Sequence, residues 1–151
     1  MVDWSAVGKR SVEKGKRYER KVVKELSKIL ELNFRRTICS GGQYECGDIK
    51  RVDGPFGLII ECKDEAGMSL LRVMKGTSNL IKYIDKDIMV VFNDDGISFC
   101  VINMNHLSNF PAPYLLCSFN GVTYKIFNIK ELHHGMFKSY IWRAKNGQEN
   151  V

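Results

Sequence analysis

Hydrophobic residues recur with a helical period near the start of the chain. Between residues 11 and 31 they recur at helical spacing, so they share one face of an amphipathic helix. Ser11 is a weak capping signal and Gly15 favours a start one turn later, so residues 1–10 are expected to form a flexible basic arm. The apolar face consists of Val12, Tyr18, Val22, Val23, Leu26, Ile29 and Leu30.

Shorter apolar runs, separated by turn residues, predict strands in the rest of the chain. Strands are expected at 33–39, 48–53, 57–63, 88–92, 97–102, 114–119 and 122–127, and further helices at 69–86 and 129–135. This order predicts an α/β fold, a mixed sheet with flanking helices and an α-β-β-β-α-β core over residues 12–102. A C-terminal β-hairpin extension over 103–144 completes a single domain, residues 11–144, and residues 145–151 form a tail.

Size and composition are those of one domain with one core. The chain has 151 residues, of which 44% are hydrophobic. It has neither a run of the roughly 18 apolar residues that span a membrane nor a signal-peptide pattern, so a cytoplasmic protein without a membrane partner is expected. The five cysteines lack CxxC spacing, which favours free thiols over disulfides or a zinc site.

Positive charge is concentrated near the N-terminus. The net charge is +6, and residues 9–36 contain eleven of the 23 lysines and arginines but only four acids. A solvated helix usually mixes the two signs more evenly, so this excess predicts a polyanionic partner, most simply nucleic acid.

Asp48, Glu61 and Lys63 form the candidate chemical site. Strand residues alternate between faces, so Glu61 and Lys63 share one side of their strand and Cys62 points to the other. Asp48 opens the preceding strand, and the turn between them folds the two strands together. Two carboxylates suit a hard cation such as Mg²⁺, and a neighbouring ammonium can orient water or neutralise a phosphate. The competing interpretation is a solvated acid–lysine pair on a strand.

These segments resemble the PD-(D/E)xK nuclease superfamily, and within it the archaeal-type Holliday junction resolvases that some phages also carry. The resemblance covers residues 12–102 and implies a restriction-endonuclease-like fold. Gly47 departs from the pattern because the family usually has proline before the first acid, and the chain from residue 103 onward does not match. The matching segments are Lys14-Gly15-Lys16-Arg17-Tyr18-Glu19-Arg20, Arg35-Arg36, Ser40-Gly41-Gly42, Asp48 and Ile60-Glu61-Cys62-Lys63.

The resemblance implies roles for the site residues. Asp48, Glu61 and the backbone carbonyl of Cys62 would ligate Mg²⁺, for which Mn²⁺ would substitute. Glu19 would complete the metal shell or hold a metal-bound water, unless it forms an ordinary helix ion pair with Lys16. Lys63 would orient the attacking water, and Ser40 would lie in a loop that closes near the scissile bond.

The resemblance also implies a DNA substrate, most specifically a four-way junction cut by a homodimer. Only one of the two adjacent strand arginines can face the site, because neighbouring strand residues point to opposite faces. The C-terminal aromatic residues either form the dimer interface or cover the sheet. Another nuclease of the superfamily, of restriction or nicking type, and an inactive nucleic-acid-binding module are the alternatives. The expected DNA contacts are Lys14, Lys16, Arg17, Arg20, Arg35, Arg36, Gly41 and Gly42.

Overall fold

The computed structural model describes residues 3–37, 47–64, 69–81, 87–103, 115–138 and 140–141 of the chain. Helices and strands follow the order that the hydrophobic pattern predicts. They are α1 (Trp4–Leu30), β1 (Phe34–Arg36), β2 (Ile49–Arg51), β3 (Leu58–Lys63), α2 (Leu70–Ile81), β4 (Asp87–Asp94), β5 (Ile97–Asn103), β6 (Leu115–Phe119), β7 (Val122–Asn128) and the 3₁₀ helices η1 (Ile129–Glu131) and η2 (His134–Phe137).

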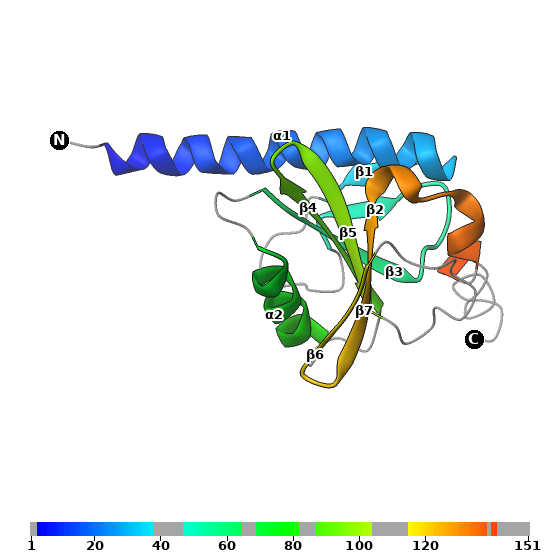
Figure 1. The fold of residues 1–151 in the computed structure, drawn as a ribbon. Coiled ribbons are helices and arrows are strands. Elements are labelled where there is room, and N and C mark those ends of the chain that lie inside the picture. The colour runs from blue at the N-terminus through cyan, green and yellow to red at the C-terminus, as the bar shows by residue number, and fades with distance from the viewer. Residues whose placement is uncertain are drawn as a thin grey trace.

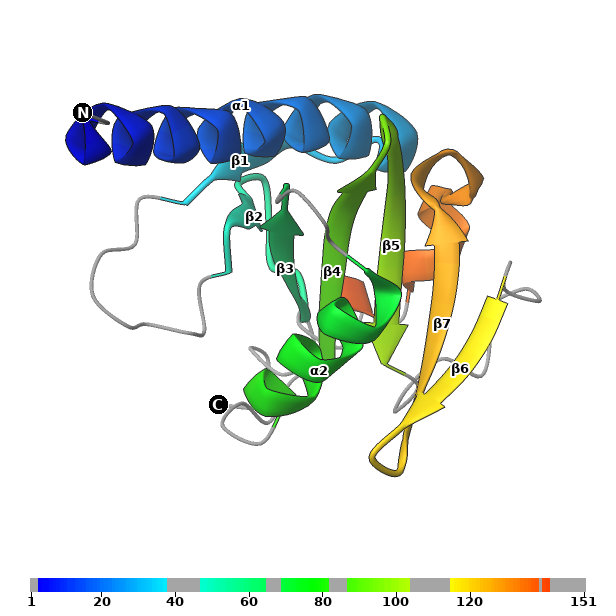
Figure 2. The same ribbon diagram turned by 60° about the vertical axis from the view of Figure 1, so that its left-hand side comes forward.

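The strands form one seven-stranded sheet in the order β1-β2-β3-β4-β5-β7-β6, with α1 and α2 on opposite faces (Figures 1 and 2). Among the described strands, only β3 and β4 pair in parallel. A parallel pair needs a crossover connection, and α2 lies in the segment that joins these two strands. The predicted fold class, an α/β restriction-endonuclease-like mixed sheet, is therefore confirmed.

Helix α1 begins well before the predicted start at Ser11, so the expectation of a loose arm over residues 1–10 is wrong from Trp4 onward. The cause is a cap that lies upstream. The carboxylate of Asp3 accepts hydrogen bonds from the backbone N–H groups of Ser5 (3.0 Å) and Ala6 (3.3 Å), which would otherwise have no partner. The buried residues of α1 begin only at Tyr18, and the N-terminal half of the helix extends past the sheet (Figure 1).

The core lies in two layers because strand residues alternate between the faces of the sheet. On β3, Leu58 and Ile60 join the larger core under α1, whereas Ile59 joins the smaller core under α2. Met89 and Val91 of β4 point to the α1 side, and their neighbours point to the α2 side. Burial on both faces explains why the strands at the centre of the sheet are continuous apolar runs.

The C-terminal aromatic residues cover the sheet. Phe127, Phe137 and Tyr140 belong to the core under α1, and each is at most 2% exposed. The hydroxyl of Tyr140 donates a hydrogen bond to the buried carboxylate of Asp87 (2.9 Å). Because these side chains are used within the monomer, they are not available as the dimer interface that the sequence left open. Tyr114 and Trp142 lie outside the described residues.

Tyr140→Phe is expected to destabilise the fold by about 1.5–3 kcal/mol, the range for a hydrogen bond to a charged group. The substitution leaves the buried carboxylate of Asp87 with one donor fewer while it preserves the ring. Urea unfolding measures the change. Ser118→Ala, which removes an exposed hydroxyl contact to Thr123, is the control and is expected to cost under about 0.5 kcal/mol. Equal effects of both substitutions would contradict a stabilising hydrogen bond from Tyr140 to Asp87.

Candidate active site

The turn between β2 and β3 brings the two acid-bearing segments together. Arg51 holds this turn closed, because its Nε donates to Asp53 (2.6 Å) and its Nη1 donates to the carbonyl of Pro55 (3.0 Å). The two strands then pair in antiparallel fashion with Ile49 opposite Ile60. The start of β2 therefore lies beside the end of β3.

Asp48 is attached to β3 by both its backbone and its side chain. Its N–H donates to the carbonyl of Ile60 (2.8 Å), and its carboxylate accepts from the N–H of Cys62 (2.8 Å). Gly47 makes this approach sterically feasible. It has a φ of 63°, and a Cβ at this position would lie 2.6 Å from the Ile60 carbonyl oxygen. Proline, whose φ is held near −65°, cannot adopt this conformation, so the glycine is required by the local geometry.

Glu61 lies against Asp48, and the two carboxyl groups share a hydrogen bond. The pKa of Glu61 is raised to about 8, first by burial, then by the negative charge of Asp48 and by that hydrogen bond, and also by Glu19. The positive charge of Lys63 acts in the opposite direction. Two such carboxyl groups need a proton or a cation between them, and their oxygen atoms are the ligands that Mg²⁺ prefers. The donor set of this pair fits a hard divalent cation.

Glu19 is engaged by an arginine. Its carboxylate accepts from Nε of Arg36 at 2.6 Å, so the helix ion pair with Lys16 is not formed. The neighbouring Tyr18 anchors the helix here through a hydrogen bond between its hydroxyl and that of Ser98 on β5 (2.9 Å). Among the described residues, no group of three or more His, Cys, Asp or Glu side chains is arranged to hold a metal ion. The structure thus brings two of the three predicted acids together, and Arg36 holds the third.

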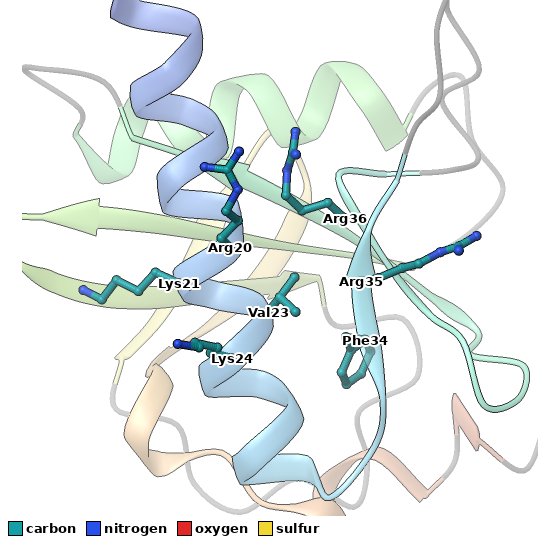
Figure 3. A pocket seen from close by; sticks show the side chains of 7 residues that line it. All are labelled: Arg20, Lys21, Val23, Lys24, Phe34, Arg35 and Arg36. Atoms are coloured by element: carbon teal, nitrogen blue, oxygen red, sulfur yellow. The ribbon is translucent and has the colours of Figure 1, made fainter.

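The two adjacent arginines of β1 do point to different sides. Arg36 is half-buried and turns toward α1, where it meets Glu19, whereas Arg35 is exposed (Figure 3). The alternation of a strand explains the difference.

The remaining predicted residues lie around this centre or outside the described part. Lys14 approaches the carboxylate of Asp64 at 3.9 Å, and Asn93 donates to the same carboxylate (3.0 Å). Arg20 pairs with Glu13 (3.1 Å), and Lys16 and Arg17 are exposed on α1. The sequence analysis did not assign Asp64 or Asn93 to the site. The position of Asp64 directly after Lys63 could have indicated that it lies near the site. Ser40, Gly41 and Gly42 lie outside the described residues.

A basic groove of about 720 Å³ lies between α1 and β1 (Figure 3). Five of its seven lining residues are lysines or arginines, and the other two are apolar. Lys21 and Lys24 are its members that sequence reasoning did not assign, although the excess of bases in this helix was visible. The groove is lined by Arg20, Lys21, Val23, Lys24, Phe34, Arg35 and Arg36.

A mixed sheet that carries an aspartate at the start of one strand and a Glu-x-Lys sequence at the end of the next is the framework of the PD-(D/E)xK nucleases. Residues 10–111, more than half of the chain, match the model of the family described as phage putative PDDEXK endonuclease. The chain belongs to this family and therefore to the PD-(D/E)xK nuclease superfamily. No curated protein and no solved structure matches the chain significantly.

The part of the chain that the structure describes contains no helix with the length and apolar character needed to cross a membrane.

Gly47→Ala is expected to lower the free energy of unfolding by at least about 1–2 kcal/mol, the cost of the left-handed conformation for a residue with a Cβ. The contact with the Ile60 carbonyl adds to this cost. Gly15→Ala is the matched control, because a Cβ there meets nothing within 4 Å on α1. It is expected to stabilise the protein by about 0.5–1 kcal/mol. If Gly47→Ala proved neutral in chemical denaturation, the close approach of Asp48 to β3 would be refuted.

Glu61→Gln is expected to stabilise the metal-free protein at pH 8 but not at pH 4.5. The folded-state pKa of Glu61 is raised from 4.5 to about 8, so between these values the folded state keeps a proton that the unfolded state has lost. The wild-type stability therefore falls as the pH rises through this window, and glutamine avoids that loss.

Urea unfolding in EDTA at several pH values measures the difference in stability between Glu61→Gln and the wild type. Glu131→Gln, at an exposed position on η1, is the control and is expected to show no such trend. A difference that stays constant between pH 4.5 and 8 would rule out the crowded carboxyl pair.

Proposed function

We propose that the protein is a divalent-metal-dependent DNA endonuclease that resolves four-way junctions by paired symmetric nicks. The observation that carries the proposal is the interaction between the Asp48 and Glu61 carboxyl groups at the end of β3, the strand that also bears Lys63. Membership of a family of endonucleases supports the reaction class. The choice of a four-way junction as substrate rests on a resemblance to the Holliday junction resolvases. That resemblance includes segments of α1 and β1 as well as this acid pair.

Asp48 and Glu61 are the residues that would hold the ion, Mg²⁺ with Mn²⁺ as a substitute, together with the backbone carbonyl of Cys62. When bound, the ion supplies Lewis acidity at the phosphate and lowers the pKa of water. Glu19 lies close enough to influence the charge of Glu61, and it would complete the shell while Arg36 fixes its carboxylate.

Lys63 contributes a positive charge on the same strand face as Glu61. Its ammonium group favours the ionised form of Glu61, because the positive charge lowers the pKa of that carboxyl group. The same group would orient the attacking water and offset the negative charge that develops on the phosphate during the reaction.

A homodimer suits the proposed substrate. A four-way junction has approximate two-fold symmetry and needs two paired nicks, which a C₂ dimer with two separated sites provides. The family description names no substrate beyond endonuclease action, so a restriction-type or nicking enzyme of the same superfamily is the alternative that the experiment must separate.

The wild-type protein is expected to nick labelled four-way junctions symmetrically near the branch point when Mg²⁺ is present, and to leave linear duplex intact. Glu61→Ala is expected to abolish cleavage, because half of the carboxylate pair is lost. Lys63→Met is expected to reduce the rate by about 100- to 1000-fold, the cost of losing one electrostatic group at the reacting centre. Denaturing gel analysis of the products measures all three.

Lys130→Ala removes an exposed lysine from η1 and serves as the control with an expected wild-type rate. Cutting of linear duplex at defined sequences would favour the restriction-type alternative. Tight junction binding without cleavage in either Mg²⁺ or Mn²⁺ would refute the proposed activity.

A further inference from the structure

The charged residues that line the basic groove between α1 and β1 are all positive. None of its seven lining residues is acidic. Of the five cations, Lys24 and Arg35 form no ion pair with any described residue, whereas the other three each pair with a glutamate outside the lining. A concave surface with one sign of charge concentrates ions of the opposite sign, so the groove is suited to an anion.

Two of the three ion pairs formed by the groove's cations are exposed and weak enough to be exchanged. Arg20 pairs with Glu13 at 3.1 Å, but both side chains are more than half exposed. Lys21 is 3.9 Å from Glu25, and half of its side chain is exposed. Exposed pairs of this kind contribute only about 0–1 kcal/mol each. An incoming polyanion can therefore recruit these cations at little cost.

The shape and lining of the groove favour a chain of phosphates over a single small anion. Val23 and Phe34 lie between α1 and β1, and the lysine and arginine side chains extend outward around them (Figure 3). A volume of about 720 Å³ lies in the range that holds a ligand of many atoms. The C–H groups of the sugars and the anionic phosphates, which alternate along a nucleic-acid backbone, match this mixture of surfaces.

We propose that the basic groove binds the sugar–phosphate backbone of nucleic acid beside the catalytic carboxylates, and that Arg36 sets the register between the two sites. The choice of nucleic acid as the polyanion rests on the proposed function. Lys21 and Lys24 are the new contacts that this assignment adds.

Arg36 has the geometry for this linking role. Its Nε donates to Glu19 at 2.6 Å, and its two terminal nitrogens have no partner among the described residues. A guanidinium group presents its donors in one rigid plane, so a single side chain can hold the acid and a groove-bound phosphate together. A lysine at this position would keep the charge but lose the fixed angle between the two contacts.

The first test measures binding without catalysis. Fluorescence anisotropy in EDTA follows labelled duplex and four-way DNA over a range of salt concentrations, for the wild type and for Lys21→Ala/Lys24→Ala. Each lost phosphate contact reduces the magnitude of the slope of log affinity against log salt by about 0.9. The slope of the double variant is therefore expected to be smaller in magnitude by about 1.8. The double variant Lys130→Ala/Lys138→Ala has the same net charge and alters exposed residues outside the groove. It is expected to keep the wild-type slope.

An unchanged slope in the groove variant, or an equal loss in both double variants, would overturn the groove as the backbone site. Competition separates the two sources of phosphate. Inorganic phosphate that displaces DNA far better than sulfate does at equal ionic strength would assign the groove to a small anion, which also overturns the proposal.

The second test concerns Arg36 as a positioning residue. Arg36→Lys is expected to lower kcat for DNA cleavage more than it raises KM, because the charge remains while the register is lost. Lys21→Ala/Lys24→Ala is expected to raise KM more than it lowers kcat. If Arg36→Lys matched the wild type in both parameters, the linking role would be excluded.

The two proposals fail separately. Cleavage by the wild type together with an unchanged salt slope in the groove variant removes the groove but leaves the nuclease. A slope loss confined to the groove variant, without cleavage by the wild type under any metal condition, removes the nuclease but leaves the groove.

Discussion

The attachment of Asp48 to β3 is the constraint on which the site depends. Two hydrogen bonds of Asp48 join it to backbone groups of β3: its N–H donates to Ile60, and its carboxylate accepts from Cys62. They form because Gly47 brings the chain closer to Ile60 than any side chain would permit. This attachment places the carboxyl group of Asp48 against that of Glu61. The repulsion between these two carboxylates makes a cation site there physically reasonable.

The long first helix connects this centre with the surface around it. Its buried part is held over the sheet through Tyr18, and the next residue, Glu19, meets Arg36 from β1. Arg36 is also a wall of the basic groove. One ion pair therefore joins an acid near the candidate metal ligands to the basic groove.

Much of the fold was predictable from the sequence because its signals are local. The strands at the centre of the sheet are apolar runs with strong turns between them, and their order was correct through β7. The predicted start of α1 at Ser11 is wrong because Asp3 caps the helix and Trp4 begins it. The role of the C-terminal aromatic residues could not be chosen either, because Phe137 and Tyr140 meet their partners only after the sheet has formed. Such contacts join residues that are distant in the sequence and leave no periodic pattern.

The sequence by itself determined the kinds of chemical group available and the faces on which they stand. The alternation of β3 placed Glu61 and Lys63 together, and the turn before it indicated that Asp48 would return to them. Only the tertiary structure decided which groups meet across elements. It paired Glu19 with Arg36 instead of Lys16, turned Arg35 outward, and gathered Lys21 and Lys24 into a groove with β1. The physical reason is that strand and helix periods specify direction within one element, whereas the distance between elements is set by how the core packs.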